Sequence, residues 1–268
     1  MNSREILVYL SLKYDGDWDK IYSDVSSKKE HDEEEVKKAL QSLKSNYITI
    51  GDEEYPESLK PMFKPPFVLF YYGDISLLSD THNKLAVVGT RHPTEYGQKI
   101  TESFVKELAE DFIIVSGLAI GIDSCAHKAA INAKGKTVAV LGNGLHNYYL
   151  NEIKENKELF EKIKENHLVI SEYPDNVGPR PDHFPVRNRI IVGISDALLV
   201  TEGKKRSGTQ ITAHLMACKN GNVCCVPTRI NEDSICNALI KEGAYLTDTP
   251  DDVYHVAGVV RPKSVFET

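Results

Sequence analysis

The sequence lacks the features that mark secreted, membrane-spanning and metal-binding proteins. It has no apolar run long enough to cross a bilayer, and its start, MNSREILVYLSLKYDGD, has no basic, apolar and cleavage regions of a signal peptide. Its five cysteines form no CxxC pair, and its nine histidines show no HxH or HExxH spacing. We therefore expect a cytoplasmic protein with reduced core thiols, no metal site and no membrane association.

The charge does not by itself indicate a nucleic-acid partner. The 268 residues carry a net charge of −7, but residues 1–80 hold 10 basic against 16 acidic side chains. The remaining residues hold 22 basic and 23 acidic side chains, so the acidity is mostly N-terminal. A local basic surface on the larger part is therefore compatible with this composition.

The N-terminal part differs in character from the rest. Residues 1–48 are predicted to form a small helical module, because apolar residues recur at helical spacing in REILVYLSLKY and EEEVKKALQSLKSNY. Residues 49–83 are predicted to be a proline-punctuated connector that ends in an extra strand from Phe67 to Tyr72. Nothing in these segments indicates catalysis.

From residue 84 onward, short aliphatic runs alternate with helical stretches. Several runs lack polar alternation, as is typical of strands that are buried on both faces of a parallel sheet. Such repeated units predict an α/β fold with a doubly wound, mostly parallel sheet and right-handed connections. The predicted strands are KLAVVG (84–89), DFIIVSG (111–117), KTVAVLG (136–142), HLVISEY (167–173), DALLVTEG (196–203) and NVCCVPT (222–228).

The stretch RNRIIVGIS (187–195) resembles a strand in composition. However, the strand DALLV begins almost directly after it, which leaves no room for a crossover between two parallel strands. We therefore predict a helix, with Pro185 at or near its first turn and Gly193 permitting close packing.

Arg187 and Arg189 fall in the first turn of this predicted helix. Residues two apart on a helix point about 200° apart, so the two side chains cannot face one phosphate. We expect one arginine to face a ligand and the other to brace a neighbouring loop through Glu172 or Glu202. The spacing does not decide which arginine has which role.

Ligands of open α/β sheets bind beyond the carboxyl ends of the strands. Four of the loops predicted there are rich in Gly, Ser and Thr, which bring backbone N–H groups close to a ligand. Basic residues lie near three of these four loops and indicate an anionic ligand, most simply a phosphate chain. The loops are GTRHPTEYG (89–97), SGLAIGID (116–123), GNGL (142–145), SEYP (171–174), EGKKRSGTQ (202–210) and PTR (227–229).

Several enzyme classes fit these loops poorly. The first loop does not match GxGxxG, the second strand does not end in an acid, and no Walker A sequence is present. Ser116, Asp123 and His127 could form a hydrolase triad, but no GxSxG elbow accompanies them, and a packed or hydrogen-bonded histidine is the simpler interpretation.

Laid out in this way, the chain resembles the DNA-processing protein A family, DprA or Smf. The resemblance covers roughly residues 52–247 and rests on an ordered series of motifs, which is more specific than one glycine loop. The motifs are YPESLKPMFKPPFVLFYYGD, VVGTRHPTEYG, SGLAIGIDSCAH, TVAVLGNGL, ISEYP, FPVRNRIIVGIS, SGTQITA, VP and LIKEGA.

This resemblance implies an extended Rossmann-like DNA-binding domain over residues 84–256, preceded by a SAM-like helical module. Residues 257–268 would be a tail without the winged-helix module that many members carry. The resemblance also implies binding of single-stranded DNA, loading of the RecA recombinase in natural transformation, and a homodimer through the Rossmann-like domain. It implies neither catalysis nor a cofactor.

The resemblance also implies a set of phosphate and DNA contacts. Lys154 or Lys157 would match a lysine that relatives use, and the chain departs from the family pattern at His146, where Asp is common. Tyr96, Tyr148, Tyr149 and Tyr173 could stack on bases, or could only fill gaps between helices and sheet. The expected contacts are Gly89, Thr90, Arg91, Ser116, Gly117, Lys154, Lys157, Arg187, Asn188, Arg189, Lys205, Arg206, Ser207, Gly208 and Thr209.

Two other functions remain open from the sequence. One is a nucleotide-binding phosphoribohydrolase of the lysine-decarboxylase-like Rossmann type, which places a Glu soon after its glycine loop, whereas SGTQITAHLMA offers no acid there. The other is a protein-interaction scaffold that has lost its ligand, against which Arg91 and the intact glycine loops argue.

Overall fold

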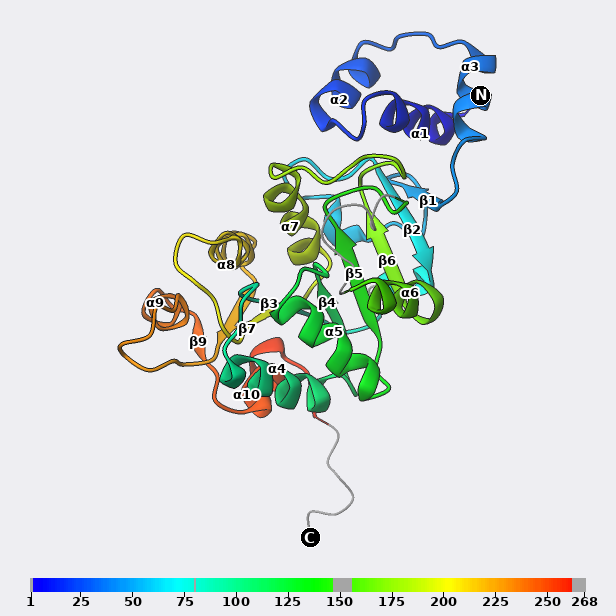
Figure 1. Ribbon diagram of the computed structural model, residues 1–268. Coiled ribbons are helices and arrows are strands. Elements are labelled where there is room, and N and C mark those ends of the chain that lie inside the picture. The colour runs from blue at the N-terminus through cyan, green and yellow to red at the C-terminus, as the bar shows by residue number, and fades with distance from the viewer. Residues whose placement is uncertain (1, 80, 147–155, 262–268) are drawn as a thin grey trace. The chain divides into compact units, whose positions relative to one another are not determined.

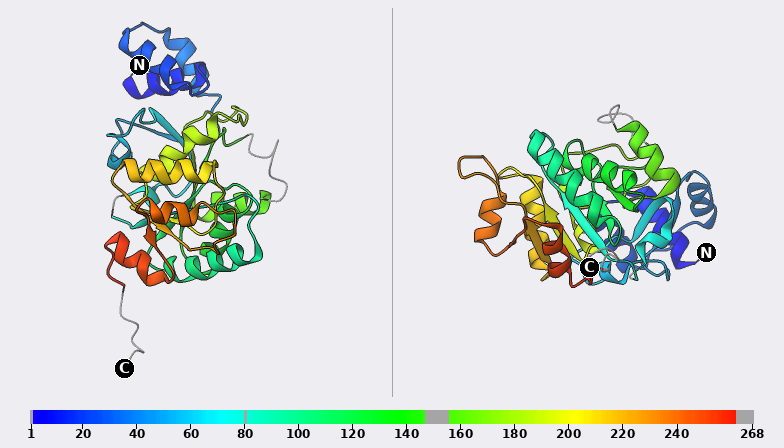
Figure 2. Two further views of the ribbon diagram at one scale, coloured as in Figure 1. Left: turned by 90° about the vertical axis from the view of Figure 1, so that its left-hand side faces the viewer. Right: turned by 90° about the horizontal axis from the view of Figure 1, so that it is seen from below.

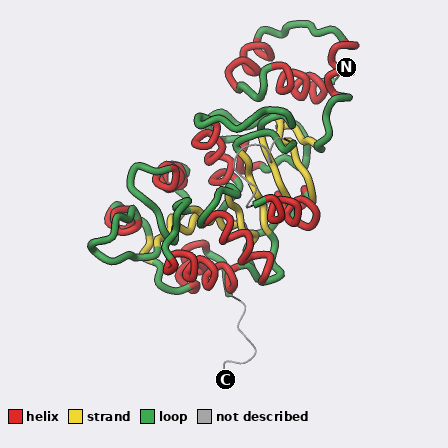
Figure 3. The backbone as a smooth tube through the Cα atoms, in the orientation of Figure 1, coloured by secondary structure: helices red, strands yellow, loops and turns green. Residues whose placement is uncertain are grey.

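The computed structural model describes residues 2–79, 81–146 and 156–261. The chain divides into two compact units, each built from two segments (Figure 1). Unit 1 contains residues 1–80 and 138–194, and unit 2 contains residues 81–137 and 195–268. Strands and helices alternate along the described chain from residue 84 onward, as the α/β prediction requires (Figure 3).

Unit 1 begins with a module of three short helices. Each helix starts at an Asn or Asp whose side chain accepts a backbone N–H of the first turn, namely Asn2, Asp17 and Asp32. The helices pack around the buried side chains of Tyr9, Leu10, Ile21 and Val36. Their bounds are α1 (Ser3–Lys13), α2 (Trp18–Ser26) and α3 (Glu33–Leu40).

The strands of unit 1 run in the order β1, β2, β6, β5, where β1 and β2 are antiparallel to their neighbours and β5 and β6 are parallel. The predicted connector strand is confirmed as β2. The prediction of helix as far as residue 48 is wrong at its end, because residues from Asn46 pair with β2. The elements are β1 (Asn46–Thr49), η1 (Glu57–Leu59), β2 (Val68–Gly73), η2 (Ile75–Leu78), β5 (Thr137–Leu141), α6 (Lys157–Asn166), β6 (Leu168–Ser171) and α7 (His183–Gly193).

Unit 2 holds five parallel strands in the order β4, β3, β7, β8, β9. All six strands predicted from residue 84 onward are confirmed, namely β3, β4, β7 and β8 in this unit and β5 and β6 in unit 1. The strand β9, two exposed residues, was not predicted. The elements are β3 (Lys84–Val88), α4 (Glu95–Leu108), β4 (Ile113–Ser116), α5 (Ile122–Asn132), β7 (Ala197–Val200), α8 (Gly208–Cys218), β8 (Asn222–Cys225), α9 (Cys236–Lys241), β9 (Tyr245–Leu246) and α10 (Pro250–Ala257).

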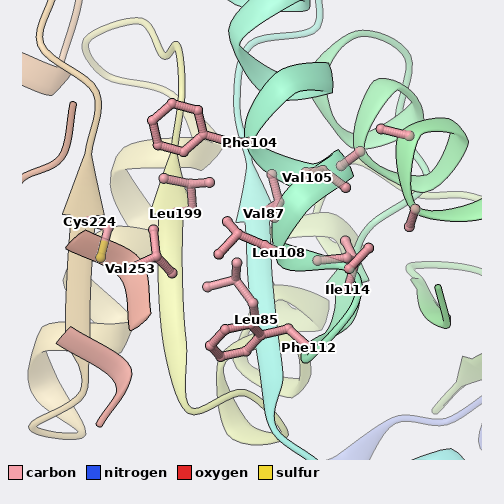
Figure 4. Close-up of a cluster of buried hydrophobic side chains, with 14 of the residues drawn as sticks. Leu85, Val87, Phe104, Val105, Leu108, Phe112, Ile114, Leu199, Cys224 and Val253 are labelled. Carbon is pink, nitrogen blue, oxygen red and sulfur yellow. The ribbon is translucent and has the colours of Figure 1, made fainter. Parts of the chain in front are cut away.

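The core of unit 2 forms on one face of these strands (Figure 4). Alternate strand residues such as Leu85, Val87 and Leu199 meet side chains of α4, α5 and α10. Connections from β3 to β4 and from β7 to β8 run in opposite directions, so right-handed crossovers place α4 and α8 on opposite faces. This arrangement is the doubly wound fold that the sequence predicts.

The thiols follow the prediction in part. All five cysteines are free, and three of them are buried, namely Cys224, Cys225 and Cys236. Burial raises the pKa of the Cys224 thiol to about 11, which keeps it protonated and unreactive at neutral pH. Cys218 is exposed, so it is not the core thiol that the sequence suggested.

The segment that resembled a strand is confirmed as the helix α7. It begins at His183, so Pro185 lies in its first turn, where a missing N–H costs no hydrogen bond. Arg187 and Arg189 therefore lie in the second turn. The prediction that they lie in the first turn is wrong. At the other end, a Cβ on Gly193 would lie 2.2 Å from the Met62 sulfur, which confirms the predicted close packing.

Candidate functional site

The carboxyl ends of β3 and β7 mark a topological switch point in unit 2. These neighbouring strands continue in opposite directions, β3 toward β4 and β7 toward β8. A crevice at such a point is the usual ligand site of an open α/β sheet. The loops after the two strands adjoin, because the Thr90 N–H donates to the Glu202 carbonyl at 2.9 Å.

Glu202 organises the first of these loops through its carboxylate. Thr94 donates to Glu202 Oε2 from its backbone nitrogen at 3.0 Å and from its hydroxyl at 2.8 Å. The Thr94 hydroxyl also accepts the Gly97 N–H and so caps α4. From the sequence, Glu202 is expected only as an arginine partner. The signal for its role in the loop is an acid directly after a buried strand at the ligand edge.

The serine and glycine that end β4 are held by buried hydrogen bonds. The Ser116 hydroxyl donates to the Val87 carbonyl at 2.6 Å, and the Gly117 N–H donates to Asp123 Oδ2 at 3.1 Å. Ser116 is fully buried, so its side chain supports the loop from inside. His127 Nδ1 lies 2.6 Å from the Thr137 hydroxyl, which confirms a packed and hydrogen-bonded histidine.

Exposed cations accompany both loops at the switch point. Arg91 follows β3, and Lys204, Lys205 and Arg206 follow β7, all four on the surface. Arg206 has a φ of 54°, and its N–H donates to Gln210 Oε1 at 2.8 Å. Such left-handed backbone at a non-glycine residue is often found at ligand-binding loops.

The start of α8 lies directly after this basic segment. Ser207 is its N-cap and Gly208 its first residue, while Thr209 is buried. Unpaired N–H groups and the helix dipole favour an anion at such an end. Unit 2 therefore combines exposed positive charge with a helix N-terminus at the predicted ligand edge.

The two arginines of α7 have different partners in unit 1. Arg189 Nη2 contacts Glu172 Oε2 as a buried ion pair, which confirms Glu172 as the bracing partner. Burial raises the pKa of the Glu172 carboxyl, and the guanidinium of Arg189 opposes this effect. Arg187 is buried, and its guanidinium donates to the Val140 carbonyl and to Asn188 Oδ1. A ligand-facing role of Arg187 or Asn188 stays a prediction.

The tyrosines divide into packed and exposed ones. Tyr173 is buried and stacks on His183 with ring centroids 3.9 Å apart, so its ring fills a gap within unit 1. Tyr96 at the start of α4 is 51% exposed and is the one of these aromatics whose surface the structure shows to be accessible. Tyr148, Tyr149 and Lys154 lie outside the described residues, and Lys157 is the exposed first residue of α6.

Gly89 permits the close approach of the loops at the switch point. A Cβ at this position would lie 2.5 Å from the Glu202 carbonyl oxygen and 2.5 Å from Ile122 Cγ1. Gly89→Ala is therefore expected to lower the free energy of unfolding by about 1–3 kcal/mol in urea titrations. Gly178→Ala, whose added Cβ meets nothing within 4 Å, is the matched control. Equal stability of the two variants would contradict this packing role.

Across the described residues, no cluster of three or more His, Cys, Asp or Glu side chains could hold a metal ion. Within the same part of the chain, no helix is both long enough and apolar enough to span a membrane.

Comparisons with known proteins identify the family to which the chain belongs. A family model described as DNA recombination-mediator protein A matches residues 46–258. The chain is 40% identical over 224 residues to the DNA processing protein DprA of Streptococcus pneumoniae, covering 83% of this chain and 77% of that protein. Identity to DprA of Bacillus subtilis is 38% over 212 residues, covering 78% and 70%.

Solved structures agree with this assignment. The X-ray structure of DprA from Streptococcus pneumoniae gives a TM-score of 0.78 at 35% identity, covering 94% of this chain and 92% of that one. DprA from Helicobacter pylori, described for its single-stranded DNA binding mode, gives a TM-score of 0.71 at 29% identity, covering 79% and 95%. The chain therefore belongs to the DNA processing protein A family, DprA, whose members are DNA recombination mediators.

Proposed function

We propose that this chain binds single-stranded DNA, protects incoming strands and loads the RecA recombinase onto them. The observation that carries the proposal is the switch point of unit 2, where Arg91 and residues 204–206 put exposed positive charge beside closely packed loops. The Helicobacter pylori relative, for which a single-stranded DNA binding mode is described, supports the same ligand class.

The chemistry of this edge suits a nucleic-acid backbone. Arginine, lysine and backbone N–H groups bind phosphates without reading base edges. Binding of this kind tolerates any sequence and weakens steeply as salt rises, because each neutralised phosphate releases condensed counterions. Such a site matches a protein that must accept strands of unrelated sequence.

One experiment separates this function from the phosphoribohydrolase alternative. Purified protein is incubated in parallel with a fluorescent oligo-dT and with AMP, and anisotropy and release of adenine are measured. Oligo-dT binding without adenine release is expected, since no acid follows the SGT loop within SGTQITAHLMA. Adenine release without oligo-dT binding would replace the proposed function by the enzymatic one.

Loading of RecA onto the bound strand is a second step, separate from DNA binding itself. Family membership supports RecA loading. We also propose, on the same basis, that the protein is cytoplasmic and acts in natural transformation. The expected result is that the protein accelerates RecA filament formation on oligo-dT that is already coated with single-strand-binding protein. If the protein binds oligo-dT but leaves the filament rate unchanged, RecA loading is excluded while DNA binding stands.

We also propose that the chain forms a homodimer through the far edge of unit 2. There the short strand β9, in the orange part of the chain in Figure 2, pairs with β8. Its residues Tyr245 and Leu246 are 48% and 54% exposed. An exposed apolar edge strand is a ready template for pairing with a second chain. The strand and the neighbouring α9 thus offer a surface that a second copy could cover.

Leu246→Asp tests this dimer, because it places a charge on the exposed edge. A shift from dimer to monomer in sedimentation-velocity experiments is expected. Val260→Asp introduces the same charge at an 89% exposed position outside the strand and is expected to leave the dimer intact. A monomeric wild type, or a dimer that survives Leu246→Asp, would contradict this interface.

A further inference from the structure

The helical module of unit 1 is tied to the loop that follows β6. Asp175 in this loop is buried, and its Oδ2 accepts the backbone N–H groups of Lys44 and Ser45 at 2.8 and 3.1 Å. These two residues lie between α3 and β1, at the exit of the module. The module is therefore held at the carboxyl end of β6, which is the ligand edge of a parallel strand pair.

A second contact holds the module at the same place. Gly16, in the turn between α1 and α2, has a φ of +77°. A Cβ on Gly16 would lie 3.0 Å from Tyr173 Cδ1 and 3.2 Å from the Glu172 carbonyl oxygen. The turn therefore rests directly on the loop after β6, and the position of the module within unit 1 is fixed at two points.

Asp175 also positions a basic residue of the neighbouring loop. Its carbonyl accepts the His146 N–H at 3.1 Å, just beyond the carboxyl end of β5. One residue thus holds the backbones of both Lys44 and His146. As a result, Lys44 Nζ lies 3.4 Å from His146 Nε2, and both side chains are exposed.

This pair has the character of an anion site. In the part of the chain that the structure describes, Lys44 has no carboxylate in ion-pair contact, while Asp175 Oδ2 is engaged by the two backbone N–H groups. A phosphate oxygen could accept from both basic side chains at once. An Asp in place of His146 would instead neutralise the lysine.

We propose that Lys44 and His146 form a phosphate-binding pair that leads single-stranded DNA from the β5–β6 edge onto the helical module. This inference rests on the proposed function and deepens it, because it makes the module part of the DNA path. Lys44 would form an ion pair with a phosphate of the strand, and His146 would donate a hydrogen bond to the same phosphate.

The test compares variants in oligo-dT anisotropy titrations over a salt series. Lys44→Gln is expected to weaken binding several-fold and to reduce the slope of log affinity against log salt by about 0.7, the value of one phosphate contact on a single strand. His146→Asp is expected to weaken binding more than His146→Gln, because the new carboxylate would pair with Lys44 and repel phosphate.

Lys20→Gln is the matched control, since Lys20 lies on the same module with its side chain 64% exposed. Thermal melts check that all variants fold, and Lys44→Gln keeps the backbone N–H that Asp175 accepts. If Lys44→Gln and His146→Asp bind like Lys20→Gln while the wild type binds oligo-dT, the pair is not a phosphate site and the proposed function stands. If the wild type binds no oligo-dT at any salt, both proposals fall together.

Discussion

Arg189→Met is expected to lower the free energy of unfolding by about 3–5 kcal/mol at neutral pH. Arg189 and Glu172 are 8% and 5% exposed and form a buried ion pair. Removal of the guanidinium leaves the carboxylate buried without its counter-charge, and neither water nor another cation reaches it at low cost. Urea unfolding followed by circular dichroism measures the change.

The loss of unfolding free energy in Arg189→Met should also depend on pH, and the burial of Glu172 determines the direction of this dependence. Burial raises the pKa of Glu172 in the folded protein, and the facing guanidinium is the influence that lowers it. Without Arg189 the folded pKa rises further above the unfolded value of about 4.3, so the folded state binds the proton more tightly than the unfolded state. Stability of the variant should then fall as pH rises above the unfolded pKa, more steeply than in the wild type.

Two further variants distinguish an ion pair from simple packing. Arg189→Met combined with Glu172→Leu removes both charges and is expected to recover much of the loss. Lys37→Gln breaks an exposed pair with Glu33 and is expected to leave stability nearly unchanged, because water screens an exposed ion pair. A double variant as unstable as Arg189→Met, or a loss that does not grow with pH, would contradict the bracing role.

Arg91→Ala is expected to weaken oligo-dT binding by about 10- to 100-fold, the value of one charge-assisted hydrogen bond of roughly 1.5–3 kcal/mol. Arg91 follows β3 at the switch point, is exposed, and carries a planar donor group that suits phosphate. Arg91→Lys should recover part of the affinity, because lysine keeps the charge but not the two parallel donors. Anisotropy titrations measure each affinity.

Arg261→Ala is the matched control for this prediction. Arg261 pairs with Glu107 at the end of α4 and with Asp251 at the start of α10, away from the loops of the ligand edge. It should leave affinity unchanged within about twofold. Arg91→Ala is also expected to keep the unfolding free energy within about 0.5–1 kcal/mol of the wild type, since exposed side chains contribute little. Equal loss of affinity in both variants would indicate general charge and not a site.

The sequence predicted those features that depend on local patterns. The strands from residue 84 onward are aliphatic runs without the polar residues that a surface strand would carry. The helix α7 was predicted because the chain between it and the next strand is too short for a crossover. The strand β1 was not predicted, because the helical spacing of the preceding apolar residues continues to Tyr47. These residues form a strand only through their pairing with β2. β9 is two exposed residues long, which leaves no pattern to detect.

The site shows the same division between local pattern and tertiary contact. Helix geometry predicted that Arg187 and Arg189 have different roles, but only the position of Glu172 shows that Arg189 is the bracing one. The function of Glu202 in holding the Thr94 loop depends on two strands meeting at one edge. The contact of Lys44 with His146 joins residues about a hundred positions apart and carries no local signal.

The basic ligand edge is proposed to bind single-stranded DNA through the phosphates of the strand. The most direct test is the affinity of the wild-type protein for oligo-dT, measured from low to high salt beside a duplex of equal length. Tight binding of oligo-dT, a linear fall of log affinity with log salt and weaker binding of the duplex are predicted. Oligo-dT binding that is absent at low salt, or that does not respond to salt, would contradict the account.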